Sequence, residues 1–253
     1  MSADTLNVVV AGAAGNMGRN VCRAVSEAEG MRVAAAVDPN LGGGGPIPEE
    51  VRESLDSGAG SFISISEALS VVQADVLVDF TWAEAARSNV LAAVERGVAA
   101  VVGTTGLGRD DLERMEAAAQ AAGTAVLLAP NFALGAVLMM EFARQSARHL
   151  DRCEIVELHH EQKRDAPSGT ARRTADLIEE VWTSAGGNRS VPIHSVRLQG
   201  VVADQEVIFG ALGQTLTISH RTTSRESFMP GVILAVRRVR DLQGLVVGLE
   251  NIL

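Results

Sequence analysis

Short runs of β-branched and other apolar residues alternate with amphipathic segments through the first half of the chain. We expect strands at residues 6–11, 32–37, 75–80, 98–102 and 125–129, with helices between them. After the first strand, Met17, Val21 and Val25 recur every four residues and form one apolar stripe, as in a helix with one buried face. This alternation is typical of a parallel sheet with crossover helices and predicts an α/β fold.

The turn after the first strand carries three glycines, Gly12, Gly15 and Gly18, in the segment AGAAGNMG. Glycines permit a tight turn and a close approach of backbone to pyrophosphate, and the following helix N-terminus favours an anion. Asp38 ends the second expected strand, about 20 residues past the third glycine, where a carboxylate binds ribose hydroxyls. The pattern favours a Rossmann-type, dinucleotide-binding sheet; an ordinary strand–helix turn with a chance aspartate is the alternative.

The residues around Asp38 favour NADH over NADPH. A 2′-phosphate needs cations, yet Pro39 and Asn40 follow the acid and Asn16 lies in the glycine turn. Arg19 is the nearest basic residue and is equally well explained as a solvated helix residue. Two further segments, GTTG at 103–106 and APNF at 129–132, follow expected strands and could orient a nicotinamide carboxamide through their backbone groups.

The pattern changes after residue 131. The later segments indicate a helix at 132–150, a strand at 153–160, a helix at 170–182, and strands at 193–200, 205–211 and 215–221. Residues 227–250 indicate a helix followed by a strand, which could return to the first sheet. We therefore place a dinucleotide-binding domain at 1–131 and 229–253, and an inserted α+β domain at 132–228. Residues 39–60, rich in glycine, are interpreted as a solvated loop, with a mobile lid as the alternative.

Composition excludes several classes of protein. The chain of 253 residues has a net charge of −9, 3% aromatic residues and no tyrosine, which argues against nucleic-acid binding by stacking or by a positive surface. It contains no apolar run near the ~20 residues of a membrane span, and its N-terminus has no signal-peptide pattern. We expect a cytoplasmic protein that binds neither membrane nor nucleic acid, with Cys22 and Cys153 as reduced, buried thiols.

Residues 157–171, ELHHEQKRDAPSGTA, combine a histidine pair with Lys163, the one lysine of the chain. If the strand extends through the pair, His159 and His160 face opposite sides of the sheet. Histidine can donate a proton near neutral pH, and lysine, unlike arginine, can give up its proton when desolvated. The following PSGT opens a helix, with Ser168 as a capping signal, and such a helix start can hold a carboxylate. The stretch favours a pocket for a dianionic acid beside a proton donor.

A zinc site is the alternative for the same stretch. Residues 160–164, HEQKR, nearly match the HExxH motif, but Arg164 stands where the second histidine ligand is needed. A loop rich in Lys and Arg is a poor cation site, so we expect no metal.

These residues closely resemble the dihydrodipicolinate reductase family. ELHHEQKRDAPSGTA resembles its signature, and further similar segments span nearly the whole chain: AGAAGNMGR, VDFTWAEA, VVGTTGL, APNFALGAV, QEVIFGALGQTLTISHRTTSRESFMPGVILAV and GLVVGLE. The resemblance implies a Rossmann-type domain, an inserted domain that binds substrate and assembles a homotetramer, and NADH or NADPH as cofactor. It further implies reduction of 4-hydroxy-tetrahydrodipicolinate, a small dicarboxylate, with loss of water, in lysine and diaminopimelate biosynthesis.

The resemblance also implies roles for individual residues. His159 corresponds to the proton donor or acceptor and Lys163 to a proton donor, while His160, Gly169 and Thr170, with Ser168 beside them, match the substrate-carboxylate contacts. The implied cofactor contacts are Gly12, Ala13, Ala14, Gly15, Asn16, Met17, Asp38, Gly103, Thr104, Thr105, Ala129, Pro130, Asn131 and Phe132. Many members carry a basic residue in the glycine turn where this chain has Asn16, which again favours NADH.

Two rival functions remain open. A semialdehyde dehydrogenase needs a cysteine nucleophile with a histidine base, but Cys153 begins a strand and Cys22 lies on a helix face. A non-catalytic NAD(H)-sensing regulator needs a DNA-binding module, and the sequence has neither a basic recognition helix nor an aromatic, positively charged patch.

Overall fold

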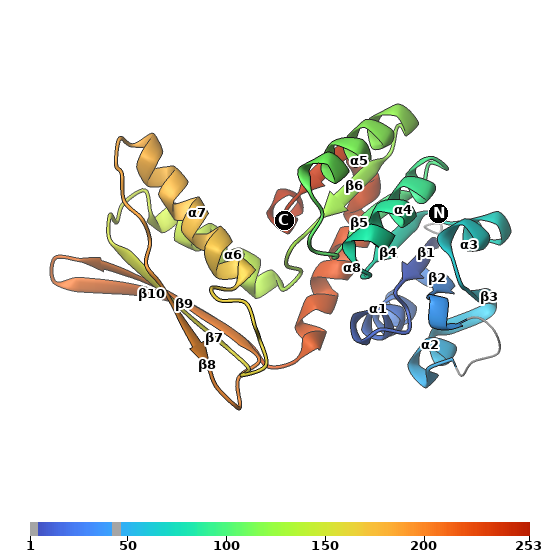
Figure 1. Ribbon diagram of the computed structural model, residues 1–253, viewed down its shortest axis with the longest axis horizontal. Helices are drawn as coiled ribbons and strands as arrows, with labels where there is room; N and C mark the ends of the chain where they lie inside the picture. Colours follow the sequence, from blue (N-terminus) through green and yellow to red (C-terminus); the bar gives the residue numbers. More distant parts are fainter. Residues whose placement is uncertain (1–4, 42–46) are drawn as a thin grey trace. The chain divides into compact units, whose positions relative to one another are not determined.

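The computed structural model describes residues 5–41 and 47–253. The chain divides into two compact units: the described residues up to Phe132 together with Met229–Leu253, and Ala133–Phe228 (Figure 1). The sequence pattern placed the corresponding boundaries between residues 131 and 132 and between residues 228 and 229. Among the described residues, no helix combines the length and apolar character that crossing a membrane requires.

The first unit is built on a parallel sheet with the strand order β11-β6-β5-β4-β1-β2-β3. Its strands are β1 (Leu6–Ala11), β2 (Met31–Val37), β3 (Leu55–Phe62), β4 (Val76–Asp79), β5 (Ala99–Val102), β6 (Ala125–Leu128) and β11 (Gly244–Val247). The run β3-β2-β1-β4-β5-β6 is the Rossmann order, and the order reverses between β1 and β4, where dinucleotides bind at the carboxyl ends of the strands. The predicted Rossmann-type parallel sheet is confirmed.

Helices cover the faces of this sheet (Figure 1). They are α1 (Asn16–Glu27), α2 (Glu49–Ser54), α3 (Ile65–Val71), α4 (Ala83–Val94), α5 (Arg109–Ala122) and α8 (Met229–Arg238). On one face α3, α4 and α5 pack in series, and on the other α1 packs against α8. Small apolar side chains such as Val9, Val90 and Val126 are fully buried in the core of the first face. Short side chains let the helices lie close to the sheet, and strands covered on both faces are apolar throughout.

The predicted loop across residues 39–60 is wrong for its second half. Residues 49–54 form α2, and β3 follows at once and pairs with β2 in parallel. The strand, LDSGAGSF, has almost no β-branched or aromatic side chains, so its local propensity is low. Backbone pairing with β2 at the edge of the sheet makes it a strand, which the sequence pattern could not indicate. Residues 42–46, the glycine-rich centre of the predicted loop or lid, lie outside the described residues.

The second unit holds a mixed sheet with the order β10-β9-β7-β8. Its elements are α6 (Leu134–Ser146), β7 (Cys153–His159), α7 (Gly169–Ser184), β8 (Ile193–Arg197), β9 (Ala203–Ala211) and β10 (Gln214–Thr222). Strand β7 runs parallel to β8 and antiparallel to β9. Helices α6 and α7 pack on each other and on this sheet, as Figure 1 shows. The predicted α+β architecture of this segment is confirmed.

Strand β7 alternates between a buried and an open face. Cys153, Ile155 and Glu157 are buried, whereas Glu154 is exposed and Val156 is half-buried. Because side chains two residues apart share a face of a strand, His159 lies on the same face as Glu157. The strand thus carries a carboxylate and an imidazole side by side at its carboxyl end.

Candidate active site

The glycine turn after β1 has the backbone geometry that only glycine tolerates well. Gly12 has a φ of +76°, and a Cβ there would lie 2.7 Å from the carbonyl oxygen of Phe80. A Cβ on Gly18 would come within 2.0 Å of the carbonyl oxygen of Gly12, so α1 can lie this close to the turn only with glycine at that position. Gly15 precedes α1 without a side-chain cap, and the first turn has no acidic residue. This helix start can therefore accept an anionic phosphate.

Asp38 lies directly beside the glycine turn. Its side chain is largely buried, at 7% exposed, and its Oδ2 accepts a hydrogen bond from the backbone N–H of Ala14 (3.3 Å). Its Oδ1 accepts from both the backbone N–H and the side-chain amide of Asn40, each at 2.9 Å. The backbone N–H groups of Gly12 and Ala13 donate to the carbonyl of Val37. The structure thus brings the acid and the turn together, which the spacing in the sequence predicted.

Arg19, the nearest basic residue to the turn, is engaged by its neighbours. Its Nη2 donates to Oδ1 of Asn16 at 2.9 Å, and its Nη1 lies 3.8 Å from a carboxylate oxygen of Glu50. The guanidinium is therefore shared between an amide and a carboxylate within this unit.

Phe80, which follows β4, joins the other predicted cofactor segments to the turn. A Cβ on Gly103 would come within 2.1 Å of the Phe80 ring, so GTTG can lie against this ring only because it begins with glycine. The rings of Phe80 and Phe132 also pack at a centroid distance of 5.5 Å, in a tilted arrangement. Phe80 therefore contacts Gly12 through its carbonyl and both Gly103 and Phe132 through its ring.

Asp79, the last residue of β4, is completely buried and accepts hydrogen bonds from the loops that follow β4 and β5. Its Oδ1 accepts from the backbone N–H and the hydroxyl of Thr81 (3.0 and 2.7 Å) and from the hydroxyl of Thr104 (2.8 Å). Its Oδ2 accepts from the side-chain amide of Asn89 at 2.8 Å. The carboxylate holds the segments after β4 and β5 at the sheet edge where the strand order reverses.

The predicted cofactor residues differ in exposure. Ala13, Thr104, Ala129 and Phe132 are buried, so their side chains form part of the core. The remaining residues lie at the surface or are partly exposed: Gly12, Ala14, Gly15, Asn16, Met17, Gly103, Thr105, Pro130 and Asn131.

In the second unit, His159 is bound by a buried carboxylate. Nδ1 of its ring forms a short hydrogen bond with Oε2 of Glu157, whose side chain is fully buried. Burial lowers the pKa of His159, and the hydrogen bond and charge of Glu157 oppose this in part. Burial raises the pKa of Glu157, but hydrogen bonds from Arg197, Ser195 and His159 outweigh it and leave that pKa below its ordinary value. The imidazole is thus mainly neutral at neutral pH, beside an ionised carboxylate.

The loop after β7 begins at His160, so the strand expected at 153–160 ends one residue earlier and the chain turns at the histidine pair. The backbone N–H of Lys163 donates to the carbonyl of His160 at 3.0 Å. His160 is exposed, whereas the Lys163 side chain is 23% exposed and its Nζ lies 2.7 Å from Oδ1 of Asp165. The hydrogen bond from Lys163 holds the pKa of Asp165 below its ordinary value.

Helix α7 begins as the sequence predicted, with Ser168 as its cap. The Ser168 hydroxyl accepts a hydrogen bond from the backbone N–H of Ala171 at 3.2 Å. The first turn contains no acidic residue, and a Cβ on Gly169 would meet no described atom within 4 Å. The start of this helix is therefore open to a carboxylate, which the helix dipole would stabilise.

Neither cysteine is suited to nucleophilic catalysis. Burial raises the pKa of Cys22 and that of Cys153 to about 12 each, so both thiols are protonated at neutral pH. Over residues 5–41 and 47–253, no cluster of three or more His, Cys, Asp or Glu side chains is arranged to hold a metal ion.

Comparison with known proteins gives the family. The model of the dihydrodipicolinate reductase N-terminal region matches residues 6–132, and that of its C-terminal region matches residues 135–253. The chain belongs to the dihydrodipicolinate reductase family. The 4-hydroxy-tetrahydrodipicolinate reductases of Moorella thermoacetica and Mycolicibacterium smegmatis are 44% and 43% identical to it, over 98% of this chain and at least 98% of theirs.

Solved structures agree with this assignment. A dipicolinate-bound dihydrodipicolinate reductase from Paenisporosarcina sp. TG-14 has 34% identity and a TM-score of 0.87, covering 98% of this chain and 100% of its own. A probable dehydrogenase from Thermotoga maritima shares the fold alone, with 12% identity and a TM-score of 0.69, over 97% of this chain and 92% of its own. The resemblance drawn from the sequence motifs is confirmed.

Several residues of the candidate site were not identified from the sequence. Phe80 and Asp79 lie in the VDFTWAEA segment that resembles the family, but nothing local shows which loops they contact. Glu157 stands two residues before His159, and strand periodicity alone could have placed the two on one face. Arg197 could not have been found, because it reaches Glu157 only through the pairing of β8 with β7.

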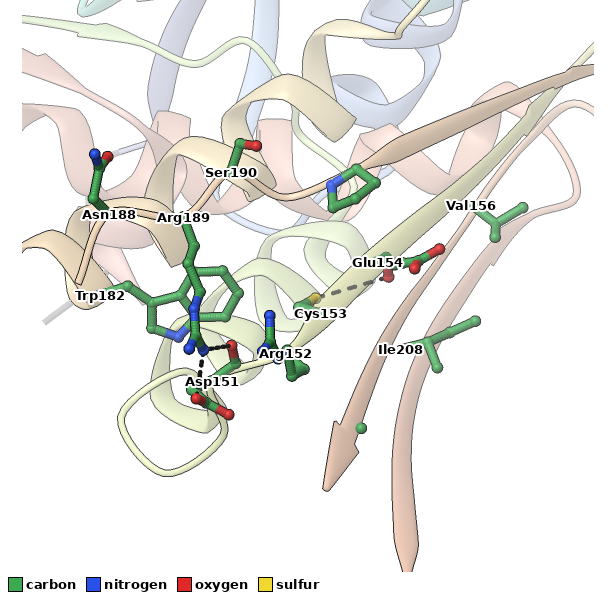
Figure 2. A pocket seen from close by; sticks show the side chains of 12 residues that line it. Asp151, Arg152, Cys153, Glu154, Val156, Trp182, Asn188, Arg189, Ser190 and Ile208 are labelled. Carbon is green, nitrogen blue, oxygen red and sulfur yellow. Dashed lines mark hydrogen bonds and ion pairs between the residues drawn. The ribbon is translucent and has the colours of Figure 1, made fainter. Parts of the chain in front are cut away.

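A cavity in the second unit contains none of the predicted site residues. It has a volume of about 580 Å³ and lies at the start of β7, opposite the end that carries His159. Figure 2 shows the side chains that line it, among them Cys153 and the ion pair of Asp151 with Arg189. This cavity is separate from the family's histidine–lysine stretch.

Proposed function

We propose that the chain is a 4-hydroxy-tetrahydrodipicolinate reductase of lysine and diaminopimelate biosynthesis, with a reduced nicotinamide cofactor and a preference for NADH. The observation that carries the proposal is the full-length similarity, at 42–44% identity, to curated relatives of that name. The buried His159–Glu157 pair, Lys163 and the open start of α7 support it, because they supply acid groups and an anion site in one short segment.

The first unit fits a dinucleotide. Gly12 and Gly18 leave no space for a Cβ, the start of α1 is uncapped and without acidic residues, and Asp38 lies at the turn. In the proposal, residues 12–17 hold the pyrophosphate and Asp38 binds the adenosine ribose. Residues 103–105 and 129–132, held against Phe80, orient the nicotinamide.

The second unit fits a small dicarboxylate. The bound dipicolinate named for the Paenisporosarcina reductase is a ligand of this class. We assign the substrate carboxylates to Gly169, Thr170 and the Ser168 cap at the start of α7, and to the exposed His160. Helix N–H groups and a histidine together would balance the two negative charges.

The reaction removes water from the substrate ring, adds hydride at ring carbon C4 and adds a proton at the neighbouring carbon. The reduced nicotinamide supplies the hydride. Negative charge develops on the ring as hydride arrives, and the ammonium of Lys163 and the imidazole of His159 stabilise it and deliver the proton. Burial lowers the pKa of His159 in the free protein. The substrate carboxylates would oppose this effect, because negative charge nearby favours the protonated imidazole.

The NADH preference rests on the charges at the turn. The carboxylate of Asp38 would repel a 2′-phosphate, and Asn16 brings no charge. Arg19 is held by Asn16 and Glu50, so its guanidinium would have to leave both to reach the phosphate.

The same proposal includes a homotetramer assembled through residues 132–228. It is supported by apolar side chains exposed on the β9–β10 hairpin, where Leu212 is 101% and Leu216 is 42% exposed. Light scattering coupled to size exclusion measures the assembly directly, and a monomer at micromolar concentration would contradict this part.

The proposed activity is tested by following NADH oxidation by absorbance with freshly prepared 4-hydroxy-tetrahydrodipicolinate. We expect substrate-dependent oxidation of one NADH per substrate, and a larger kcat/KM with NADH than with NADPH in parallel assays. Absence of substrate-dependent turnover with either cofactor would overturn the proposal, and a larger kcat/KM with NADPH would overturn the preference alone.

A further inference from the structure

A single buried carboxylate at the end of β7 connects the imidazole, the neighbouring strand and the start of α7. We propose that Glu157 is a positioning residue: it fixes the His159 ring with Nδ1 as a hydrogen-bond donor, so that Nε2 is the nitrogen that exchanges the catalytic proton. This inference rests on the proposed function for the role of His159. The geometry that carries it does not depend on the identity of the substrate.

The contacts of Glu157 satisfy both of its oxygens. Oε1 accepts from Nη2 of Arg197 (2.9 Å) and from the backbone N–H of Ser168 (3.3 Å). Oε2 accepts from Nη1 of Arg197 (3.0 Å) and forms the short hydrogen bond with Nδ1 of His159. Since the side chain is 0% exposed, water does not compete for these positions.

Arg197 determines the protonation state of this carboxylate. Guanidinium has donors and no acceptor, and its two-pronged contact with Glu157 matches an ionised carboxylate. An ionised carboxylate only accepts hydrogen bonds, so the imidazole nitrogen that contacts it must carry the hydrogen. The tautomer of neutral His159 is thereby assigned as Nδ1–H, and Nε2 has the free lone pair.

The same network fixes the loop between β7 and α7. Nη2 of Arg197 also donates to the carbonyl of Asp165 at 2.7 Å, and Glu157 receives the N–H of the helix cap Ser168. Two points of the loop after Lys163, the carbonyl of Asp165 and the N–H of Ser168, are thus attached to one ion pair. Glu157 therefore holds His159, the proposed proton donor, and the start of α7, the proposed carboxylate site, in fixed positions relative to each other.

The first experiment uses the unaltered protein, labelled with ¹⁵N-histidine. Two-bond ¹⁵N–¹H spectra at pH 8 distinguish the two neutral tautomers, and His159→Gln identifies the signal by its loss among the five histidines. We expect His159 as the Nδ1–H tautomer. An Nε2–H tautomer, or a mixture as in a free imidazole, would overturn the proposal, and no enzyme activity is needed for the measurement.

The second experiment uses Glu157→Gln. The Oε1 position faces two fixed donors, from Arg197 and Ser168, whereas the Oε2 position faces one, Nη1 of Arg197, beside an imidazole that can also accept, so the amide oxygen is expected at Oε1. The amide NH₂ then takes the Oε2 position and donates to Nδ1 of His159, which forces the Nε2–H tautomer. We expect this inverted tautomer in the spectrum, and retention of the Nδ1–H form at full activity would contradict the positioning role.

Kinetics separate positioning from a purely structural effect. For Glu157→Gln, kcat should fall by about 10²-fold, within the ~10²–10⁴-fold that a positioned general acid supplies. The high-pH limb of kcat/KM, which reports protonated His159 in the free enzyme, should move to lower pH, because the imidazolium loses its carboxylate and keeps Lys163 and Arg197 nearby. The NADH dissociation constant should stay unchanged.

Glu154→Gln is the matched control. Glu154 lies on the same strand but on its open face, and its Oε2 pairs with Nε2 of His194 at 2.8 Å. That pair is more than half exposed, so its loss should change kcat by less than about twofold. Equal losses in both variants would overturn the assignment. If the unaltered protein itself lacked reductase activity, the proposed function would fail, while the tautomer measurement would still decide the geometry.

Discussion

The ammonium of Lys163 lies 2.7 Å from Oδ1 of Asp165, two residues further along the loop between β7 and α7. The pair is partly open to solvent, with the Asp165 side chain 52% exposed, so the lysine can leave its partner at little cost. In a chain whose other basic residues are arginines, this position keeps the compact, titratable cation.

Lys163→Arg should remove most of the activity although it keeps the positive charge. Arginine is wider, is effectively never deprotonated and would form a two-pronged contact with Asp165 that holds it away from the substrate. We expect kcat to fall by about 10²-fold, as for the loss of a positioned acid, with an unchanged NADH dissociation constant by fluorescence. Arg164→Lys, in the same loop, is the control. Near-normal turnover of Lys163→Arg would show that only charge matters at this position.

His159→Ala and His160→Ala should affect different kinetic constants. Loss of the proposed proton donor at His159 should lower kcat by ~10²–10⁴-fold and leave NADH binding intact. Loss of the exposed His160 should mainly raise the KM for substrate, because it removes a carboxylate contact. Steady-state kinetics with both variants distinguish the roles. A larger kcat defect at His160 than at His159 would reverse the assignment.

Asp38→Asn should weaken NADH binding and narrow the preference over NADPH. The carboxylate is proposed to bind the ribose hydroxyls, and a hydrogen bond to a charged group contributes about 1.5–3 kcal/mol, or ~10–100-fold in affinity. Removing the negative charge also removes its repulsion of a 2′-phosphate. Titration with each cofactor measures both effects, with the exposed Asp56→Asn as control. An unchanged NADH affinity would place the adenosine elsewhere.

Acidification should destabilise the protein from about neutral pH downward. Burial lowers the pKa of His159 and of His220, and Glu157 and Asp204 respectively oppose this in part. Each folded-state pKa lies below the ordinary value of 6.5, so the unfolded chain binds more protons as pH falls below that value, and stability decreases. The stability that the ionised Glu157 contributes is lost only as the pH falls below its ordinary pKa of 4.5.

Thermal unfolding from about pH 7.5 to pH 5 measures this dependence in the range where histidine titrates. We expect the melting temperature to decrease with pH, and His220→Gln to reduce the slope without changing its sign. The ring of His220 packs against Gly135, and His220 is not one of the proposed catalytic groups, so turnover serves as the control. A melting temperature that rises on acidification would contradict the direction of both pKa shifts.

Local pattern determined much of the first unit. The apolar strands follow a local periodicity, and the glycines at 12 and 18 and the acid at 38 follow a recognisable spacing, so the Rossmann-type sheet and its turn were predictable. Edge strand β3 was missed because LDSGAGSF has low strand propensity and becomes a strand only by pairing with β2. Helix α7 was predicted from its Ser168 cap, since capping is a contact between residues three apart.

The sequence by itself determined the fold class, the family and the stretch that carries His159 and Lys163. Tertiary structure alone decided what surrounds these groups: Arg197 meets Glu157 across 40 residues of sequence, and Phe80 gathers three loops that are separate in the chain. Strand propensity and motif spacing describe interactions within a few residues. The orientation of the proposed proton donor instead depends on an ion pair that exists only after β8 pairs with β7, because that pairing places a guanidinium beside a carboxylate which could not otherwise be buried.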